Sequence, residues 1–241
     1  MKIKAIEGII ISETNYSESS KILQLFTKEY GIIGLMSKGS RKLKSKLRAF
    51  SNPLSYAKFH LYYKEDALST LIDADIIDPL VNIQNDLKKM SYANFLLELI
   101  RQVYKQNEDE ELYDILIASL KKINEGFDPL IITQIVQFKA LDYLGVGLNL
   151  DCCSKCETTE NIVTISIDSA GYICSDCYQD ERRYSEKMYK VLRLFNYVDI
   201  NKISKLELSN DTIREIDEFI DSYYDKYTGI YLITKELLKK I

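Results

Sequence analysis

The run Tyr56–Tyr63 reads YAKFHLYY, and it decides the fold of the first third of the chain. Ala57, Phe59, Leu61 and Tyr63 alternate in it with Tyr56, Lys58, His60 and Tyr62. Alternation with a period of two is typical of a β-strand. Similar short runs lie at residues 3–11, 21–26, 31–36 and 68–77, with turn residues between them. Five short strands in succession predict a small closed barrel, for which the five-stranded OB fold is the common solution.

The apolar pattern changes after Pro79, from a period of two to the helical period of about 3.6. Helices are expected at residues 86–104, 110–123, 128–144, 185–198 and 211–224, and a last one after Gly229. Asp128-Pro129 is a helix start, because aspartate caps the free N–H groups and proline fits the first turn, and Gly145 is the matching stop. We therefore place a domain boundary at Pro79, with residues 1–79 as the barrel domain and 80–241 as a helical domain.

All five cysteines lie between two of these helices. Cys153 and Cys156 form one CxxC pair and Cys174 and Cys177 a second, with 17 residues between them. Each pair can direct two sulfurs to one point, so the two pairs supply the four thiolates of a tetrahedral zinc site. Four sulfur ligands leave no position open for water, which indicates one structural Zn²⁺ in a zinc ribbon inserted at about residues 150–180.

Two alternatives for the cysteines stay open at this point. Cys152 could replace Cys153, since zinc tolerates a three-residue spacer. The thiols could also be free, or Cys174 and Cys177 could form a redox pair in a thiol enzyme. The expected fold is therefore α+β and multidomain, with an N-terminal OB-fold β-barrel followed by an α-helical bundle that carries a four-cysteine zinc ribbon.

Six basic residues gather within eleven positions after the third predicted strand, and no acid occurs from residue 30 to residue 64. Spaced cations on a mobile connection at the barrel rim suit a nucleic-acid backbone, although such a run can also be a solvated loop. Nearby aromatic residues could stack on unpaired bases, and about half of them should be core. The candidate cations are Lys38, Arg41, Lys42, Lys44, Lys46 and Arg48, and the aromatic candidates are Tyr30, Phe50, Tyr56, Phe59, Tyr62 and Tyr63.

Composition and charge narrow the class of protein. The 241 residues are 46% hydrophobic and 28% charged, which is typical of a soluble globular protein, and no apolar run is long enough to span a membrane. The N-terminus does not resemble a signal peptide, so we expect a cytoplasmic protein with reduced thiols. The net charge of −4 is uneven, because residues 1–79 hold 12 Lys/Arg and 9 Asp/Glu, or +3, and residues 80–241 hold 20 and 27, or −7. A nucleic-acid site on the first domain is thus compatible with the acidic total.

Several enzyme classes are disfavoured. His60 is the single histidine, which excludes multi-histidine metal centres. Asp73, Asp75 and Asp78 could imitate a nuclease cluster, but nothing else in the sequence supports one, so a solvated strand face is expected. No phosphate-binding glycine motif indicates use of ATP. We expect a binding protein and not an enzyme.

Several stretches together resemble the bacterial DNA repair protein RecO family. The resemblance spans most of residues 1–180, and Glu157 departs from it where the family usually has glycine. It is carried by Tyr16-Ser-Glu-Ser-Ser-Lys-Ile, Lys38-Gly-Ser-Arg-Lys, Leu144-Gly145, Leu150-Asp151, the two cysteine pairs and Ser169-Ala-Gly-Tyr-Ile-Cys.

The resemblance implies a recombination mediator with an OB barrel, a helical bundle and often a zinc ribbon. Such a protein binds single- and double-stranded DNA, anneals complementary strands and, with RecR, helps to load RecA. It also binds the acidic C-terminal tail of the single-stranded DNA-binding protein, and it would be cytoplasmic and nucleoid-associated. Lys38, Arg41, Lys42 and Arg48 match basic positions of the family, whereas Lys44 and Lys46 are added on charge alone. An RNA- or ribosome-associated protein with the same two modules remains the alternative.

Overall fold

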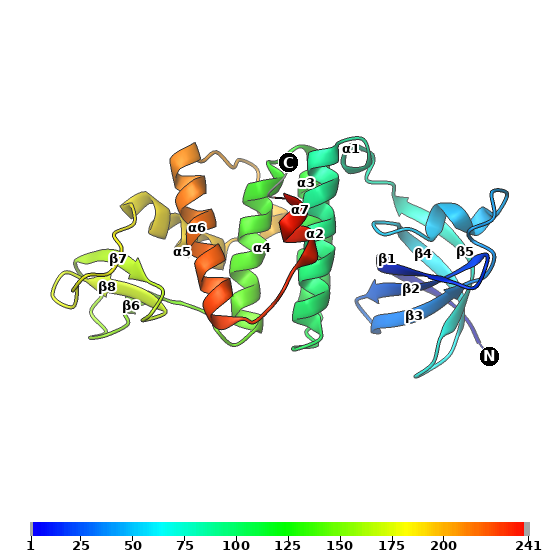
Figure 1. Cartoon of the computed structure of the whole chain (residues 1–241), viewed down its shortest axis with the longest axis horizontal. Helices are drawn as coiled ribbons and strands as arrows, with labels where there is room; N and C mark the ends of the chain where they lie inside the picture. Colours follow the sequence, from blue (N-terminus) through cyan, green and yellow to red (C-terminus); the bar gives the residue numbers. More distant parts are fainter. Residues whose placement is uncertain (1, 239–241) are drawn as a thin grey trace.

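The computed structural model describes residues 2–238 and has three parts in a row (Figure 1). A β-barrel lies at one end, helices occupy the middle, and a small three-stranded sheet lies at the other end. The predicted α+β architecture is confirmed. Within residues 2–238, no helix combines the length and hydrophobicity needed to cross a membrane.

The five strands between residues 2 and 78 close into a barrel with the order β1-β2-β3-β5-β4, so the predicted five-stranded barrel is confirmed. All pairs are antiparallel except β3 with β5. A register shift between Ile10 and Ser12 lets β1 bend, so that its first half pairs with β4 and its second half with β2. The strands are β1 (Lys2–Tyr16), β2 (Ser20–Thr27), β3 (Gly31–Ser37), β4 (Tyr56–Tyr63) and β5 (Ser69–Asp78).

The barrel interior is apolar and is covered at both ends. Leu47 and Phe50, from the short 3-10 helix η1 (Lys46–Phe50), pack against the interior core. Tyr30 and Tyr63 also pack against it, and the ammonium of Lys4 lies over both rings, 4.5 and 4.0 Å from their centroids. The interior core consists of Ile6, Ile10, Leu23, Leu25, Leu35, Ala57, Phe59, Leu61, Leu71 and Ala74.

The helical part surrounds one central helix, α4, which has buried residues on all its faces. Asp128 caps α4 as predicted, since its side chain accepts a hydrogen bond of 2.9 Å from the N–H of Leu130. The helices are α1 (Val81–Gln84), α2 (Leu87–Tyr104), α3 (Glu111–Glu125), α4 (Pro129–Tyr143), α5 (Glu186–Tyr197), α6 (Asn210–Tyr227) and α7 (Ile233–Leu238), with a 3-10 turn η2 (Ile200–Lys202) after α5.

The barrel and the helices share a hydrophobic core. Ile9 and Phe26 of the barrel belong to the same buried cluster as the helices. The ring of Phe26 makes edge contacts with Tyr104 and Tyr113, at centroid distances of 4.9 and 5.4 Å. Gly31 allows this approach, because a Cβ there would lie 2.1 Å from the Tyr104 hydroxyl and its φ is +59°.

The small sheet carries the cysteines. It contains β6 (Asn149–Cys153), β7 (Ile162–Ser166) and β8 (Gly171–Cys174) in the order β6-β8-β7. Tyr172 joins the sheet to α5, since its hydroxyl donates to the carbonyl of Tyr189 at 3.1 Å and the two rings are in edge contact. The sheet thus packs on the helices, away from the barrel (Figure 1).

Candidate nucleic-acid interface and four-cysteine cluster

The six candidate cations lie together on the connection between β3 and β4, at one end of the barrel, and we call them the basic rim. All six residues are exposed, and none of them forms an ion pair within the part of the chain that the structure describes. Among the described residues, no rim cation is therefore paired directly with a carboxylate. The basic rim consists of Lys38, Arg41, Lys42, Lys44, Lys46 and Arg48.

The connection between β3 and β4, which the sequence predicts to be mobile, has backbone hydrogen bonds along its length. Successive backbone turns join Lys42 to Gly39, Ser45 to Lys42 and Arg48 to Ser45. The buried hydroxyls of Ser37 and Ser51 are 2.8 Å apart and tie the two ends of the connection together. These contacts, together with the packing of η1 against the barrel core, hold the backbone of the connection against the barrel.

The β1–β2 hairpin holds the basic rim from outside. The N–H of Arg41 donates to the carbonyl of Ser19 at 2.9 Å, and its guanidinium donates to the carbonyl of Ser17 at 3.1 Å. At the other end of the connection, the ammonium of Lys21 donates to the Ser51 carbonyl at 2.9 Å and to Asn52 Oδ1 at 3.0 Å. Lys21 also pairs with Glu13. This clamp was missed in the sequence, because nothing in Ser-Ser-Lys indicates which distant segment it contacts.

The six aromatic candidates are not placed as a base-stacking surface on the rim. Phe59 lies in the barrel interior and Phe50 packs against it. Tyr56 is buried against the helices, and its hydroxyl donates to Glu7. Tyr30 and Tyr63 close the barrel end around Lys4. Tyr62 is exposed but pairs with Ile3, near the start of β1 and far along that strand from the hairpin.

The aspartates on β5 are engaged locally. Asp75 is hydrogen-bonded to His60 Nε2 at 2.8 Å, Asp73 accepts from the N–H of Ala74, and Asp78 accepts from the N–H of Leu80. Within the described residues, the single group of three or more His, Cys, Asp or Glu side chains arranged to share a metal ion is the cysteine cluster. The aspartates therefore do not converge on one metal.

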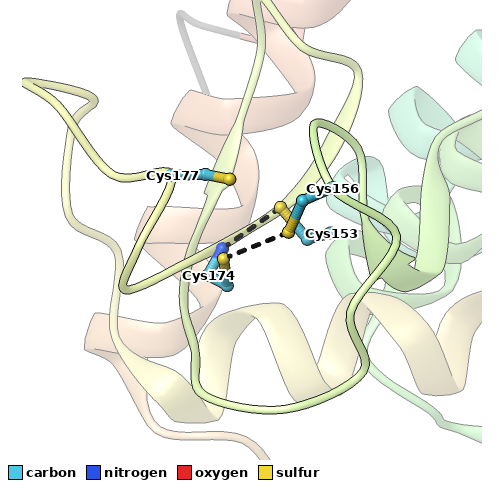
Figure 2. A group of neighbouring side chains, drawn as sticks. All are labelled: Cys153, Cys156, Cys174 and Cys177. Carbon is cyan, nitrogen blue, oxygen red and sulfur yellow. Dashed lines mark hydrogen bonds between the residues drawn. The ribbon is translucent and has the colours of Figure 1, made fainter.

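Cys153, Cys156, Cys174 and Cys177 converge from two turns, with all four sulfurs within 4.8 Å of one another (Figure 2). The sulfurs of Cys156 and Cys174 are 3.6 Å apart. A tetrahedral zinc with Zn–S bonds of about 2.3 Å requires sulfurs about 3.8 Å apart, so this donor set fits such an ion. Cys152 lies outside the group, and its sulfur accepts from Asn149 Nδ2 at 3.3 Å.

The local electrostatics favour the thiolate form of Cys153 and oppose the thiolate form of Cys177. Burial raises the pKa of the Cys153 thiol, but the backbone N–H groups of Cys174, Lys155 and Cys156 outweigh burial and lower the pKa to about 6. Contact with the Cys156 sulfur, burial and the remaining sulfurs raise the pKa of Cys177 to about 12. Four crowded thiols oppose one another's ionisation, and a divalent cation among them removes that penalty.

An apolar groove of about 440 Å³ beside α5 was also missed in the sequence. Leu194 lines it and is 66% exposed. Two lysines, Lys202 and Lys205, line the same groove. Its apolar lining includes Ile135, Val191, Phe195, Val198, Ile203 and Leu206.

Comparison with known proteins shows that two family models together match most of the chain. The family model "Recombination protein O N terminal" matches residues 1–80, and "Recombination protein O C terminal" matches residues 84–236. The chain is 35% identical to the DNA repair protein RecO of Bacillus subtilis (strain 168) and 33% identical to that of Listeria monocytogenes serotype 4b (strain CLIP80459), in both cases over 98% of this chain and 93% of the relative. It is 34% identical to that of Bacillus pumilus (strain SAFR-032), over 100% of this chain and 95% of the relative.

Proposed function

Because the chain belongs to the RecO family of DNA repair proteins, which are non-enzymatic recombination mediators, we propose that it binds single- and double-stranded DNA at the basic rim and anneals complementary strands. One observation carries this proposal: six exposed cations, which form no ion pair with any residue from 2 to 238, are held at one end of a barrel. Residues 1–79 would be the DNA-binding domain, and residues 80–241 would serve protein partners.

The mechanism follows from charge. Two DNA strands repel each other through their phosphates, and lysine and arginine side chains neutralise phosphates and release the counterions bound to them. A rim that holds one strand while attracting another lowers the repulsion between them and raises their local concentration. This route to annealing needs neither ATP nor a covalent step.

A double variant tests the rim. Lys42→Glu with Lys44→Glu should weaken binding of single-stranded DNA and flatten its salt dependence, measured by fluorescence anisotropy over a range of salt. If four to six phosphates are contacted, the slope of log K against log salt for the unmodified chain should be about −3 to −4. The matched control is Lys88→Glu with Lys105→Glu, which reverses one exposed charge on α2 and one at its C-terminal cap. An unchanged slope in the rim variant would remove the rim from the DNA site.

We also propose one structural Zn²⁺ bound by Cys153, Cys156, Cys174 and Cys177. Convergence of the four sulfurs within 4.8 Å supports it. The ion would order the two cysteine turns, whose loops have few apolar residues of their own. A thiol redox role would instead require a reactive thiol in place of bound metal, which elemental analysis and thiol titration of the purified chain distinguish.

For the helical domain we propose that the groove beside α5 binds the acidic C-terminal tail of single-stranded DNA-binding protein. The groove offers an apolar surface together with Lys202 and Lys205, whose positive charges complement an acidic tail. The cavity of about 490 Å³ between α3 and α4 suits this tail less, because its lining includes Glu111, Asp114, Asp142 and Asp199. RecR, and RecA indirectly, are the further proposed partners, in a cytoplasmic, nucleoid-associated setting.

The tail proposal predicts that Leu194→Glu abolishes binding of a peptide with the tail sequence, because it places an acid in the apolar groove. Leu87→Glu on α2 is the control, since Leu87 is a similarly exposed leucine outside the groove. Peptide affinity is measured by calorimetry, and annealing is then measured on strands coated with single-stranded DNA-binding protein with and without its tail. Equal peptide binding by Leu194→Glu and the unmodified chain would exclude this groove.

A further inference from the structure

Tyr16 has an exposed aromatic side chain beside the basic rim, and this side chain does not pack into either core. It is the last residue of β1 and is 51% exposed. Its side chain makes no hydrogen bond and no ring contact within the described chain. Tyr16 is not among the six aromatic candidates named from the sequence. Those six all lie in residues 30–63, the stretch around the cations that contains no acid.

The hairpin register places Tyr16 next to the rim. Tyr16 pairs with Ser20 across the β1–β2 hairpin, so their side chains lie on the same face. The hydroxyl of Ser20 accepts a hydrogen bond of 3.2 Å from the N–H of Gly39, where the basic connection begins. The guanidinium of Arg41 donates to the carbonyl of Ser17, the residue directly after Tyr16. An aromatic ring and a fixed cation are therefore neighbours.

A second exposed apolar side chain lies within the rim itself. Leu43 is 86% exposed and stands between Lys42 and Lys44. Binding to phosphates requires cations but does not require an exposed tyrosine or leucine beside them. Unpaired bases do, because they offer flat apolar faces to side chains while the backbone phosphates meet the cations.

We propose that Tyr16 stacks on an unpaired DNA base while Arg41 and the other rim cations hold the flanking phosphates. The inference rests on the proposed DNA-binding function of the basic rim and adds a contact that depends on bases. In a duplex the bases are already stacked and paired, so Tyr16 gains no contact there. The rim should therefore distinguish single strands from duplex through this residue.

The test compares Tyr16→Ala and Tyr16→Phe in the full chain, using fluorescence anisotropy with a single-stranded oligonucleotide, the matching duplex and an abasic strand of equal length. Tyr16→Ala should weaken single-strand binding about tenfold, with an unchanged salt slope and unchanged duplex affinity. Tyr16→Phe should retain affinity, since it retains the ring. On the abasic strand, Tyr16→Ala and the unmodified chain should bind equally.

Stacking also has a direct signal, because 2-aminopurine in the strand is quenched when it stacks. That quenching on binding should be lost in Tyr16→Ala and kept in Tyr62→Ala, the control at an exposed tyrosine on β4. Undiminished single-strand affinity of Tyr16→Ala, or an equal loss on duplex or abasic DNA, would overturn the proposal. If the Lys42/Lys44 variant binds normally as well, the rim itself is not the DNA site; if only that variant weakens binding, the stacking role alone fails.

Discussion

Glu157 has a left-handed backbone conformation, with φ at 61°, directly after the first cysteine pair. This conformation turns the following chain back, so that the carbonyl of Thr158 accepts a hydrogen bond of 2.8 Å from the N–H of Cys153. Glycine adopts such angles without a steric penalty, whereas a residue with a side chain does not. The turn is thus built with a residue less suited to it.

The residue-scale prediction is that Glu157→Gly stabilises the cysteine turn. Removing the side chain relieves a left-handed strain of about 1–2 kcal/mol, partly offset by the greater freedom of glycine in the unfolded chain. The net gain should be up to about 1 kcal/mol, seen as a rise of a few degrees in melting temperature. Glu160→Gly, at an exposed position nearby, is the control and should not stabilise the chain. A lower melting temperature for Glu157→Gly would contradict the inference that Glu157 is strained in this conformation.

Among the elements, strands and helices were predictable where one face is consistently buried. The period-two run of β4 has the predicted bounds, because its alternate side chains face the barrel interior. The last five residues of β1, 12–16, were missed, since they pair with β2 beyond the apolar core. Alternation also does not say what covers the outer face of a strand. The burial of Tyr56 by the helices after β5 was therefore not predictable from it.

The cysteine spacing predicted which four sulfurs gather, but β6 could not be predicted from it. Asn149–Cys153 pairs with β8 in a short parallel arrangement that depends on the folded position of β8. Similarly, the six rim cations were visible as a charge run, whereas the clamp by Lys21 and the position of Tyr16 depend on contacts across the hairpin. Local pattern thus identified the groups, and tertiary packing determined their neighbours.

At the element scale, metal removal should loosen the cysteine turns while the β7–β8 hairpin stays folded. Ile165 and Ile173 are buried, and the hydroxyl of Tyr189 donates to the carbonyl of Ile162 at 3.2 Å, so α5 holds the hairpin without the metal. After chelation, hydrogen exchange should accelerate in residues 153–160 and 174–181 and stay slow in 162–173. Cys152→Ser should leave the metal content unchanged. Uniformly fast exchange across residues 149–181 would show instead that the metal holds the whole sheet.

At the scale of the whole molecule, the cysteine sheet and the barrel lie at opposite ends with the helices between them (Figure 1). Cys156→Ser should therefore lower stability while single-strand affinity at the basic rim changes little. The comparison is a melting curve beside an anisotropy titration of the same preparation. An equal loss of both would mean that the sheet supports the DNA site despite this separation.

The barrel and the helices should unfold together, because Phe26 packs its ring between Tyr104 and Tyr113 in a shared core. Phe26→Ala should cost about 3–5 kcal/mol and weaken the coupling of the two parts. Phe59→Ala is the matched control, since it removes an equally buried ring from the barrel interior alone.

In calorimetry the unmodified chain should show one unfolding transition, whereas Phe26→Ala should show two, one for the barrel and one for the helices. Phe59→Ala should instead destabilise the barrel and leave the contact with the helices intact. A single transition in Phe26→Ala, shifted as much as that of Phe59→Ala, would show that Ile9, Ile11 and Tyr56 suffice to couple the two parts.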